Sequence, residues 1–381
     1  MQTPIYLDNN ATTEFAPPVF DAMQAALERY GNPSSAHSLG REARQVVDAA
    51  RESVADLIGA ADAREIVFTS GGTESDNWAI LGAVTAQADR KHIVTTRVEH
   101  EAVRKLCEKL EKDGSRVTWL NVDNQGRLDL DQLKDSLGPE TAVVSVMMAN
   151  NETGVIFPVA EVADIVKERS KALVHVDGVN AAGKVAIDLK NTNIDLFSIS
   201  AHKFHGPKGV GALYIRNGVN LHSHQIGGGQ ESGRRAGTEA VHQIAGLGVA
   251  AEFARDLSAM KRVKSLRDRL ESEILTTFAN ASVNGDTDSR LPNTSNISFE
   301  NLNGEMILHY LDDAGICVST GSACNSESKV SSPVLAAMDV PYSKAMGSIR
   351  FSLGRLNSEA DVEQALIELA GAIEKLVTMS A

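Results

Sequence analysis

Residues 198–209 read SISAHKFHGPKG, and they are the most informative part of the chain. The apolar run 194–199 is typical of a buried strand, and it leads into a segment that brings serine, histidine and lysine together. A lysine at a strand end inside a pocket can lose its proton through desolvation and form a Schiff base. Lys203 is better placed for this than Lys208, which lies in a Gly-Pro-Lys-Gly turn, although taken alone either is more simply a surface lysine.

Around this stretch, short β-branched runs alternate with amphipathic segments, which predicts an α/β fold with helices on both faces of a parallel sheet. The strands expected from this pattern cover 65–69, 92–96, 142–147, 172–177 and 194–200, and the helices cover 101–112 and 159–170. From about Ala240 long helices replace the alternation, followed by a shorter strand at 294–299. We therefore expect a second, smaller domain from about residue 256, with a pocket between the two domains.

Composition excludes several classes of protein. The 381 residues are 43% hydrophobic, enough for a large core, and 37 basic against 50 acidic residues give a net charge of -13. Binding to nucleic acid or anionic lipid is therefore not expected. A leader peptide and an apolar run near the roughly 18 residues of a membrane span are both missing, so a cytoplasmic location is expected. The cysteines, Cys107, Cys317 and Cys324, fit a reducing compartment.

Residues 69–75, TSGGTES, join the end of a strand to a helix that we expect to start near Asp76. Glycines allow close approach, and the free backbone N–H groups at a helix N-terminus bind phosphate. An ordinary turn capped by Thr73 or Ser75 explains the segment equally well. Its spacing matches neither a Walker A loop nor a dinucleotide GxGxxG motif, which disfavours a nucleotide.

Asp177 and Cys324 also stand at positions that suit chemistry. Asp177 ends the strand 172–177, where α/β folds place ligands, and it could pair with a cationic ring nitrogen; a turn or capping aspartate is the commoner interpretation. Cys324 lies in the small polar stretch 319–328, whereas Cys317 has apolar neighbours. That setting suits an exposed thiolate nucleophile, although an incidental loop cysteine also explains it.

A metal site is disfavoured by the spacing of its possible ligands. Neither a cysteine nor a carboxylate stands at matching spacing from the histidines that could serve. These are His202, His205, His222 and His224.

Nine stretches in this order match one known arrangement along nearly the whole chain. They are 6–13 (YLDNNATT), 31–35, 72–75, 99–100, 150–154, 200–209, 234–238, 322–324 and 349–352. The chain thereby resembles the cysteine desulfurases of the NifS and IscS branch, in the class-V aminotransferase family of pyridoxal-phosphate enzymes. The resemblance implies an aspartate-aminotransferase-like fold of type I, with a large mixed or parallel sheet. It places the large cofactor-binding domain at 15–255 and a small α+β domain, with the cysteine loop, at 1–14 plus 256–381.

The resemblance implies pyridoxal 5'-phosphate as the cofactor and assigns residues to its ring. Lys203 would hold it as a Schiff base and later move the substrate α-proton. Asp177 would keep the ring nitrogen protonated, and His100 would lie on the ring face and assist as an acid or base. Asn180 replaces the more usual glutamine at the phenolic oxygen, which makes this contact less secure. Gly178 replaces the more usual alanine and is expected to loosen the same turn.

The resemblance also assigns the phosphate and the substrate. The phosphate would be bound by Gly72, Thr73, Ser200 and His202, joined by Thr238 from the neighbouring subunit of a homodimer. Asn151 would contact cofactor and substrate, and Arg350 would bind the substrate carboxylate in bidentate fashion.

The activity so implied is removal of sulfur from L-cysteine, which gives L-alanine and a persulfide on Cys324. The persulfide would pass to an iron–sulfur scaffold protein or another sulfur acceptor. It could transiently ligate a nascent cluster, and no stable metal is expected. The chain stops at Ala381 without the C-terminal extension of the housekeeping branch, so nitrogenase-dedicated and general roles both stay open. A selenocysteine lyase or an aminotransferase of the same fold, neither of which needs a cysteine for its main step, is the alternative.

Overall fold

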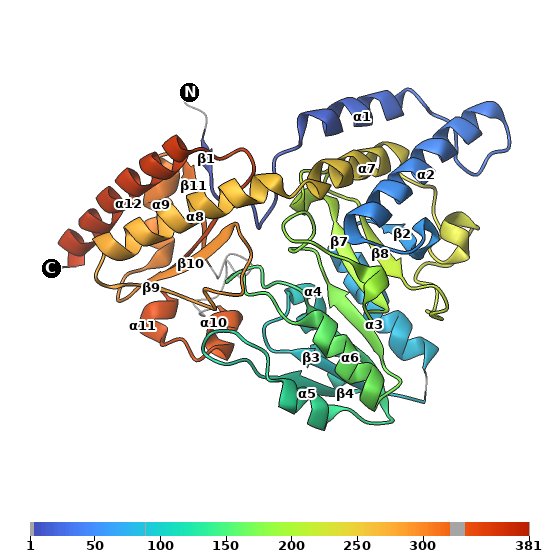
Figure 1. Ribbon diagram of the computed structural model, residues 1–381, viewed down its shortest axis with the longest axis horizontal. Coiled ribbons are helices and arrows are strands. Elements are labelled where there is room, and N and C mark those ends of the chain that lie inside the picture. The colour runs from blue at the N-terminus through green and yellow to red at the C-terminus, as the bar shows by residue number, and fades with distance from the viewer. Residues whose placement is uncertain (1–3, 88, 321–331, 381) are drawn as a thin grey trace.

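A computed structural model describes residues 4–87, 89–320 and 332–380 (Figure 1). Cys324 therefore lies outside the described residues. Within the described ranges, the model contains no helix that is both long enough and apolar enough to span a membrane.

A seven-stranded sheet in the order β2-β8-β7-β6-β5-β3-β4 forms the centre of the larger part of the molecule. Its strands are β2 (Ile66–Thr69), β3 (His92–Thr96), β4 (Arg116–Leu120), β5 (Thr141–Met147), β6 (Leu173–Asp177), β7 (Leu196–Ser200) and β8 (Gly211–Ile215). Neighbours from β4 through β7 are parallel, whereas β8 is antiparallel to both β2 and β7. The predicted parallel sheet is thus confirmed at its centre, and β8 makes the whole sheet mixed.

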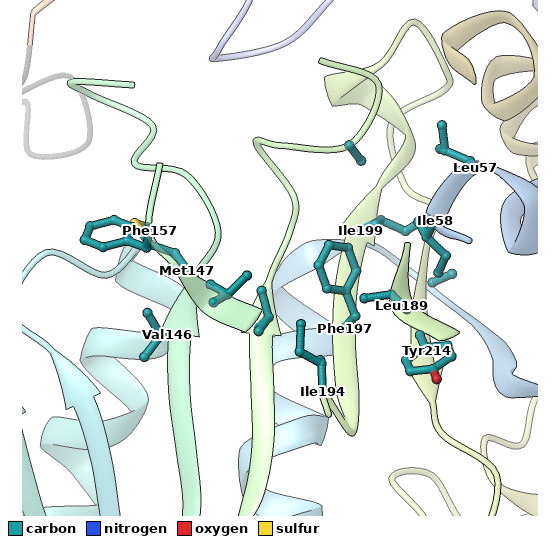
Figure 2. Close-up of a cluster of buried hydrophobic side chains, with 14 of the residues drawn as sticks. Leu57, Ile58, Val146, Met147, Phe157, Leu189, Ile194, Phe197, Ile199 and Tyr214 are labelled. Atoms are coloured by element: carbon teal, nitrogen blue, oxygen red, sulfur yellow. The ribbon is translucent and has the colours of Figure 1, made fainter. Parts of the chain in front are cut away.

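Helices cover both faces of this sheet, as the alternating pattern predicts. They are α1 (Pro17–Leu27), α2 (Ser38–Ile58), α3 (Gly72–Ala86), α4 (Glu101–Lys112), α5 (Leu130–Ser136), α6 (Val159–Arg169) and α7 (Val241–Arg255). In β5, Val143 packs in a cluster with α3 and α4, while the next residue, Val144, belongs to the larger cluster on the opposite face. Figure 2 shows part of that larger cluster, with Leu57 and Ile58 of α2 beside Ile199 of β7.

The smaller part has a sheet and a core of its own. The sheet, in the order β12-β13-β10-β9, is antiparallel, and β1 pairs in parallel with β11. These strands are β1 (Ile5–Tyr6), β9 (Ala281–Val283), β10 (Thr294–Phe299), β11 (Ile316–Cys317), β12 (Ser319–Thr320) and β13 (Ser348–Ser352). The helices are α8 (Ser258–Thr277), α9 (Gly304–Asp313), α10 (Pro333–Ala337), α11 (Tyr342–Ala345) and α12 (Glu359–Ser380).

The second core joins Leu7, near the N-terminus, to apolar side chains between Met260 and Leu376. This composition is consistent with a division into 15–255 and 1–14 plus 256–381. The boundaries themselves stay a prediction.

Candidate active site

A pocket of about 170 Å³ lies at the carboxyl edge of the parallel strands, where Met147 ends β5, Asp177 ends β6 and Ser200 ends β7. The strand directions bring side chains to this edge that are far apart in the sequence. Residues predicted for the site that line the pocket are Gly72, Thr73, His100, Asn151, Asp177, Asn180, Ser200, His202 and Lys203.

The segment predicted to bind phosphate forms a helix earlier than expected. α3 begins at Gly72 and not near Asp76, because Gly71, with φ of 148°, makes the turn out of β2. Ser75 Oγ donates to the Gly71 carbonyl at 3.1 Å and so satisfies a backbone acceptor, not a donor. The N-cap position is held by Gly71, which has no side chain to cap the helix. Capping by Thr73 or Ser75 is therefore wrong, and the first backbone N–H groups of α3 can bind an anion.

Two buried carboxylates form one wall of the pocket. Asp177 Oδ1 accepts from the Val179 N–H at 2.9 Å, and burial together with Asp76 raises the pKa of Asp177 to about 6. Asp76 lines the same pocket at 1% exposure, and burial raises its pKa to about 7. His175 Nε2 is 3.5 Å from Asp76 Oδ1, but burial lowers the pKa of His175 to about 4, so this pair is not ionic at neutral pH. The wall suits a cationic ring nitrogen.

Both predicted site histidines are held by a hydrogen bond at Nδ1. His100 Nδ1 accepts from the Ala102 N–H at 3.2 Å at the start of α4, and burial lowers the pKa of His100. His202 Nδ1 lies 3.2 Å from Thr12 Oγ1, and burial together with Lys203 lowers the pKa of His202 to about 4. Near pH 7 we expect neutral rings, and the proton of His100 is then on Nε2.

Lys203 follows β7 directly, in the short turn Ala201–Lys203. Its Nζ donates to the carbonyls of Asn10 and Ala11, at 2.6 Å and 2.9 Å. The lysine is thus directed into the site and toward the N-terminal segment, so the surface-lysine interpretation is wrong for Lys203.

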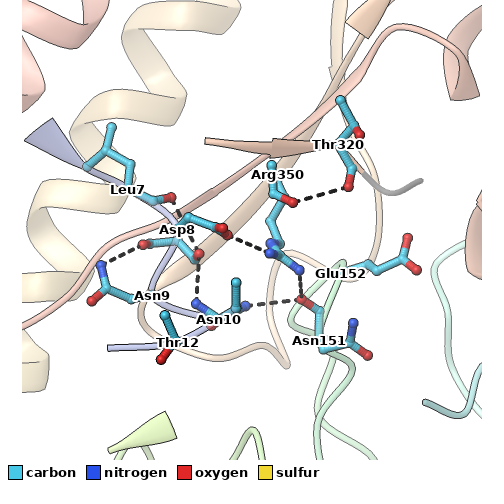
Figure 3. A network of polar contacts seen from close by, with 12 residues as sticks. Leu7, Asp8, Asn9, Asn10, Thr12, Asn151, Glu152, Thr320 and Arg350 are labelled. Carbon is cyan, nitrogen blue, oxygen red and sulfur yellow. Dashed lines mark hydrogen bonds and ion pairs between the residues drawn. The ribbon is translucent and has the colours of Figure 1, made fainter. Parts of the chain in front are cut away.

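Arg350 on β13 lies beside the pocket and is fixed on two sides (Figure 3). Its Nη2 donates to Asp8 Oδ1 at 2.6 Å, and its Nη1 donates to the Asn151 carbonyl at 3.0 Å. Its buried Nε has no hydrogen-bond partner among the residues that the structure describes. A guanidinium held at one edge with a donor to spare suits a carboxylate ligand.

The described residues on either side of the cysteine segment contact this part of the molecule. Ser319 pairs with Arg350 between β12 and β13. Ser332 Oγ donates to the carboxyl group of Glu152, whose pKa burial raises to about 7. The described residues that flank this segment, Ser319 and Ser332, therefore lie next to Arg350 and Glu152.

Among the residues predicted to bind the phosphate, Thr238 does not line the pocket. It is exposed, in a segment that an ion pair of 2.8 Å between Arg235 and Glu74 ties to α3. Its predicted contribution across a dimer stays a prediction.

The packing around the turn after β6 shows why a glycine fits there. A Cβ at Gly178 would lie 1.9 Å from Cζ of Phe197, and the predicted loosening of this turn stays a prediction. The ring of Phe197 occupies the space that an alanine methyl group would need.

Sequence reasoning missed three residues of the site: Asp76, Lys184 and Asn10. Asp76 could have been found, since it lies four residues after Gly72 and so on the same face of α3. Lys184 and Asn10 are 7% and 1% exposed, and their burial leaves no periodic signal in a turn or an N-terminal segment.

A mixed sheet with a pocket at the carboxyl edge of its parallel strands is the architecture that the comparisons with known proteins have to match. The model of the aminotransferase class-V family matches residues 5–365, and the chain belongs to this family. A cysteine desulfurase from Nostoc sp. is 50% identical over 379 residues, covering 99% of this chain and 94% of the relative. The cysteine desulfurase NifS of Azotobacter vinelandii is 48% identical over 379 residues, covering 99% and 94%. The solved structure of a NifS-like protein has a TM-score of 0.92 at 40% identity, covering 98% of this chain and all of that one. The resemblance and the fold class predicted from the sequence are confirmed.

Proposed function

We propose that this chain is an L-cysteine desulfurase that binds pyridoxal 5'-phosphate in the pocket at the end of β5, β6 and β7. The observation that carries this proposal is that three chemically different groups meet there: Lys203, the buried Asp177 and the uncapped start of α3 at Gly72. An amine, a carboxylate and a helix N-terminus match the aldehyde, the ring nitrogen and the phosphate of this cofactor. The cysteine desulfurases to which the chain is similar support the same conclusion.

When bound, the cofactor supplies an electron sink for the charge left at the substrate Cα. Lys203 would accept the Cα proton, because it is the amine in the pocket. Asp177, ionised above about pH 6, would hold the proton on the ring nitrogen. Arg350, positioned by Asp8, would bind the substrate carboxylate beside Asn151. The neutral His100 would be a second proton donor or acceptor.

Cys324 would be the sulfur acceptor within the chain. Its thiolate would attack Sγ of the substrate, so that an S–S bond forms while the Cβ–Sγ bond breaks and leaves its electron pair on the carbon side. Protonation of Cβ and return of the Cα proton by Lys203 would then give L-alanine. The contacts of Ser319 and Ser332 next to the pocket support this assignment. The persulfide would then pass to an iron–sulfur scaffold protein or another acceptor.

We further propose that the protein is a cytoplasmic homodimer. On and after α1, Phe20, Leu27 and Tyr30 are 60%, 62% and 82% exposed, an amount of apolar surface that supports a subunit interface. The free thiols of Cys107 and Cys317 support a reducing compartment.

The test is the visible spectrum of the purified protein, followed by assays of alanine and sulfide after addition of L-cysteine. We expect a yellow protein absorbing near roughly 390–420 nm, as lysine Schiff bases of this cofactor do. Alanine should form in the wild type and in Cys317→Ala, and fail to form in Cys324→Ala. Alanine formation that does not depend on Cys324 would favour a lyase or an aminotransferase. A colourless protein that takes up no pyridoxal phosphate would overturn the proposal.

A further inference from the structure

Lys184 is a buried lysine whose amine has an unusual environment. It lies in the turn that follows β6, at 7% exposure. Its Nζ donates to three oxygens of neutral groups: Asn10 Oδ1 at 3.1 Å, the Asn180 carbonyl at 3.0 Å and Asn180 Oδ1 at 2.7 Å. In the described part of the chain, no carboxylate pairs with it. Buried lysines are normally paired with an acid, so this arrangement calls for an explanation.

Lys184 sets the direction in which the amide of Asn180 points. Its Nζ donates to Asn180 Oδ1 at 2.7 Å, and in its charged form it only donates hydrogen bonds, so the amide oxygen then faces the lysine. With Oδ1 turned toward Lys184, the Nδ2 group remains for the pocket that Asn180 lines. One of its N–H groups lies 3.5 Å from the Asn150 carbonyl, a weak contact, and the other has no assigned acceptor among the described residues.

The second acceptor of Lys184 holds the amine in place. Asn10 Oδ1 also accepts from Asn293 at 3.0 Å, while Asn10 Nδ2 donates to Thr294 Oγ1 at 2.8 Å and to the Asn151 carbonyl at 3.2 Å. With all four hydrogen bonds made, the side chain of Asn10 cannot flip. Lys184 is therefore clamped between Asn10 and Asn180.

We propose that Lys184 is a positioning residue for the cofactor, which orients the amide of Asn180 so that its Nδ2 donates to the anionic ring oxygen of bound pyridoxal phosphate. This role rests on the proposed function. It also explains how Asn180, one methylene shorter than glutamine, can bind the ring oxygen. Its side chain is already held in one orientation, so it loses little conformational entropy when the cofactor binds.

Charge supports the same assignment. Burial and the nearby cations Lys203 and Arg350 lower the pKa of Lys184 well below its usual range. Asp8 balances Arg350 at 2.6 Å, whereas Lys184 has only neutral partners. An anionic ligand in the pocket would supply the negative charge that balances Lys184. Ligand binding and the charged form of Lys184 therefore favour each other.

The test measures binding of pyridoxal phosphate to cofactor-free protein, together with the pH at which the visible band of the bound cofactor changes. Lys184→Met keeps the length of the side chain and removes its charge and its three N–H groups. We expect its affinity to fall about 10- to 100-fold, the effect of a lost hydrogen bond to a charged group, and the pH transition to shift. The matched control is Lys190→Met, an exposed lysine in the same segment, which should behave as the wild type.

A second variant covers the case in which Lys184→Met does not fold. Asn180→Asp has the same shape and can pair with Lys184, yet it offers no N–H to the pocket, so it should fold and lose a similar factor in affinity. The single variant Asn180→Ala is measured as well. In the double variant Lys184→Met, Asn180→Ala, the losses of the two single variants should not multiply, because both changes remove one interaction.

The failure of this inference and that of the proposed function look different. Lys184→Met or Asn180→Asp with wild-type affinity and spectrum, or losses that multiply in the double variant, would overturn only the role of Lys184. A wild type that takes up no pyridoxal phosphate would overturn the proposed function and this role together.

Discussion

At the scale of single residues, Gly178 shows how the packing of a neighbouring side chain can favour a glycine. A Cβ at position 178 would lie 1.9 Å from Cζ and 2.1 Å from Cε1 of Phe197. The φ of Gly178 is not in the left-handed region, so a larger residue is opposed by packing and not by the backbone.

We therefore predict that Gly178→Ala lowers the free energy of unfolding by about 1–3 kcal/mol, the usual cost of overpacking a core. Phe197→Leu, which removes ring atoms, should recover part of this loss in the double variant. Urea unfolding of the three variants measures both effects. A Gly178→Ala protein as stable as the wild type would show that the ring of Phe197 moves without cost.

Asp76 gives a prediction on pH. Burial raises its pKa in the folded protein from the ordinary 3.8 to about 7. Below about pH 4, Asp76 is protonated in both the folded and the unfolded chain, and its ionisation does not lower the free energy of unfolding. As pH rises from about 4 to 7, the unfolded chain loses this proton first, so the free energy of unfolding falls across that window.

Asp76→Asn cannot ionise, so we expect it to stabilise the cofactor-free protein more at pH 8 than at pH 4. The difference between the two pH values should be a few kcal/mol, about 4 at most, from roughly three pKa units. Thermal or urea unfolding at both pH values measures it, with the exposed Asp48→Asn as control. An equal effect at pH 4 and pH 8 would mean that Asp76 does not ionise in this window.

The site residues that were predicted from the sequence differ from those that were missed in whether a local sequence pattern marks their position. Asp177 and Lys203 could be predicted because each stands at or just after the end of an apolar strand, a position visible in the sequence. Lys184 could not, because a buried lysine and an exposed one look alike until the tertiary contacts are known. Its partner Asn10 comes from a segment 174 residues away in the chain.

At the scale of elements, strong local patterns were predicted well and turns less well. The bounds of β3, α4 and β10 agree with the predicted 92–96, 101–112 and 294–299. The start of α3 was predicted four residues late, because a Gly-Gly pair disfavours a helix by propensity. In the fold, Gly71 makes the turn out of β2 from which the helix starts, and Gly72 lies in close contact with Val179 in the turn after β6.

That contact makes Gly72 a test of the phosphate site. A Cβ at position 72 would lie 2.8 Å from Cγ2 of Val179, which also lines the pocket. Gly72→Ala should therefore shift the start of α3 and weaken pyridoxal phosphate about tenfold or more, while pyridoxal, which lacks the phosphate, should lose less.

The control for this variant is Gly371→Ala in α12, where an added Cβ has no atom within 4 Å. It should bind both compounds as the wild type does, with a slight gain in helix stability. Equal losses for pyridoxal and its phosphate in Gly72→Ala would place the phosphate elsewhere.

At the scale of the whole molecule, Thr238 is exposed while the other residues predicted for the phosphate line the pocket. If Thr238 completes the pocket of a second subunit, each site needs two chains. Two inactive variants then complement one another. Lys203→Ala removes the amine from its own pocket but leaves Thr238 intact, and Thr238→Asp places a negative charge at the phosphate of the partner's pocket.

We predict that an equimolar mixture of the two variants, unfolded and refolded together, recovers activity. Half of the dimers are mixed, and each mixed dimer has one pocket with both Lys203 and Thr238, so about a quarter of the wild-type rate is expected from random pairing. Each variant refolded alone provides the baseline. A mixture no more active than its parts would show that Thr238 acts within its own chain or outside the site. Recovery would establish that the exposed segment around Thr238 functions only in the dimer, which also accounts for its position away from the pocket of its own chain.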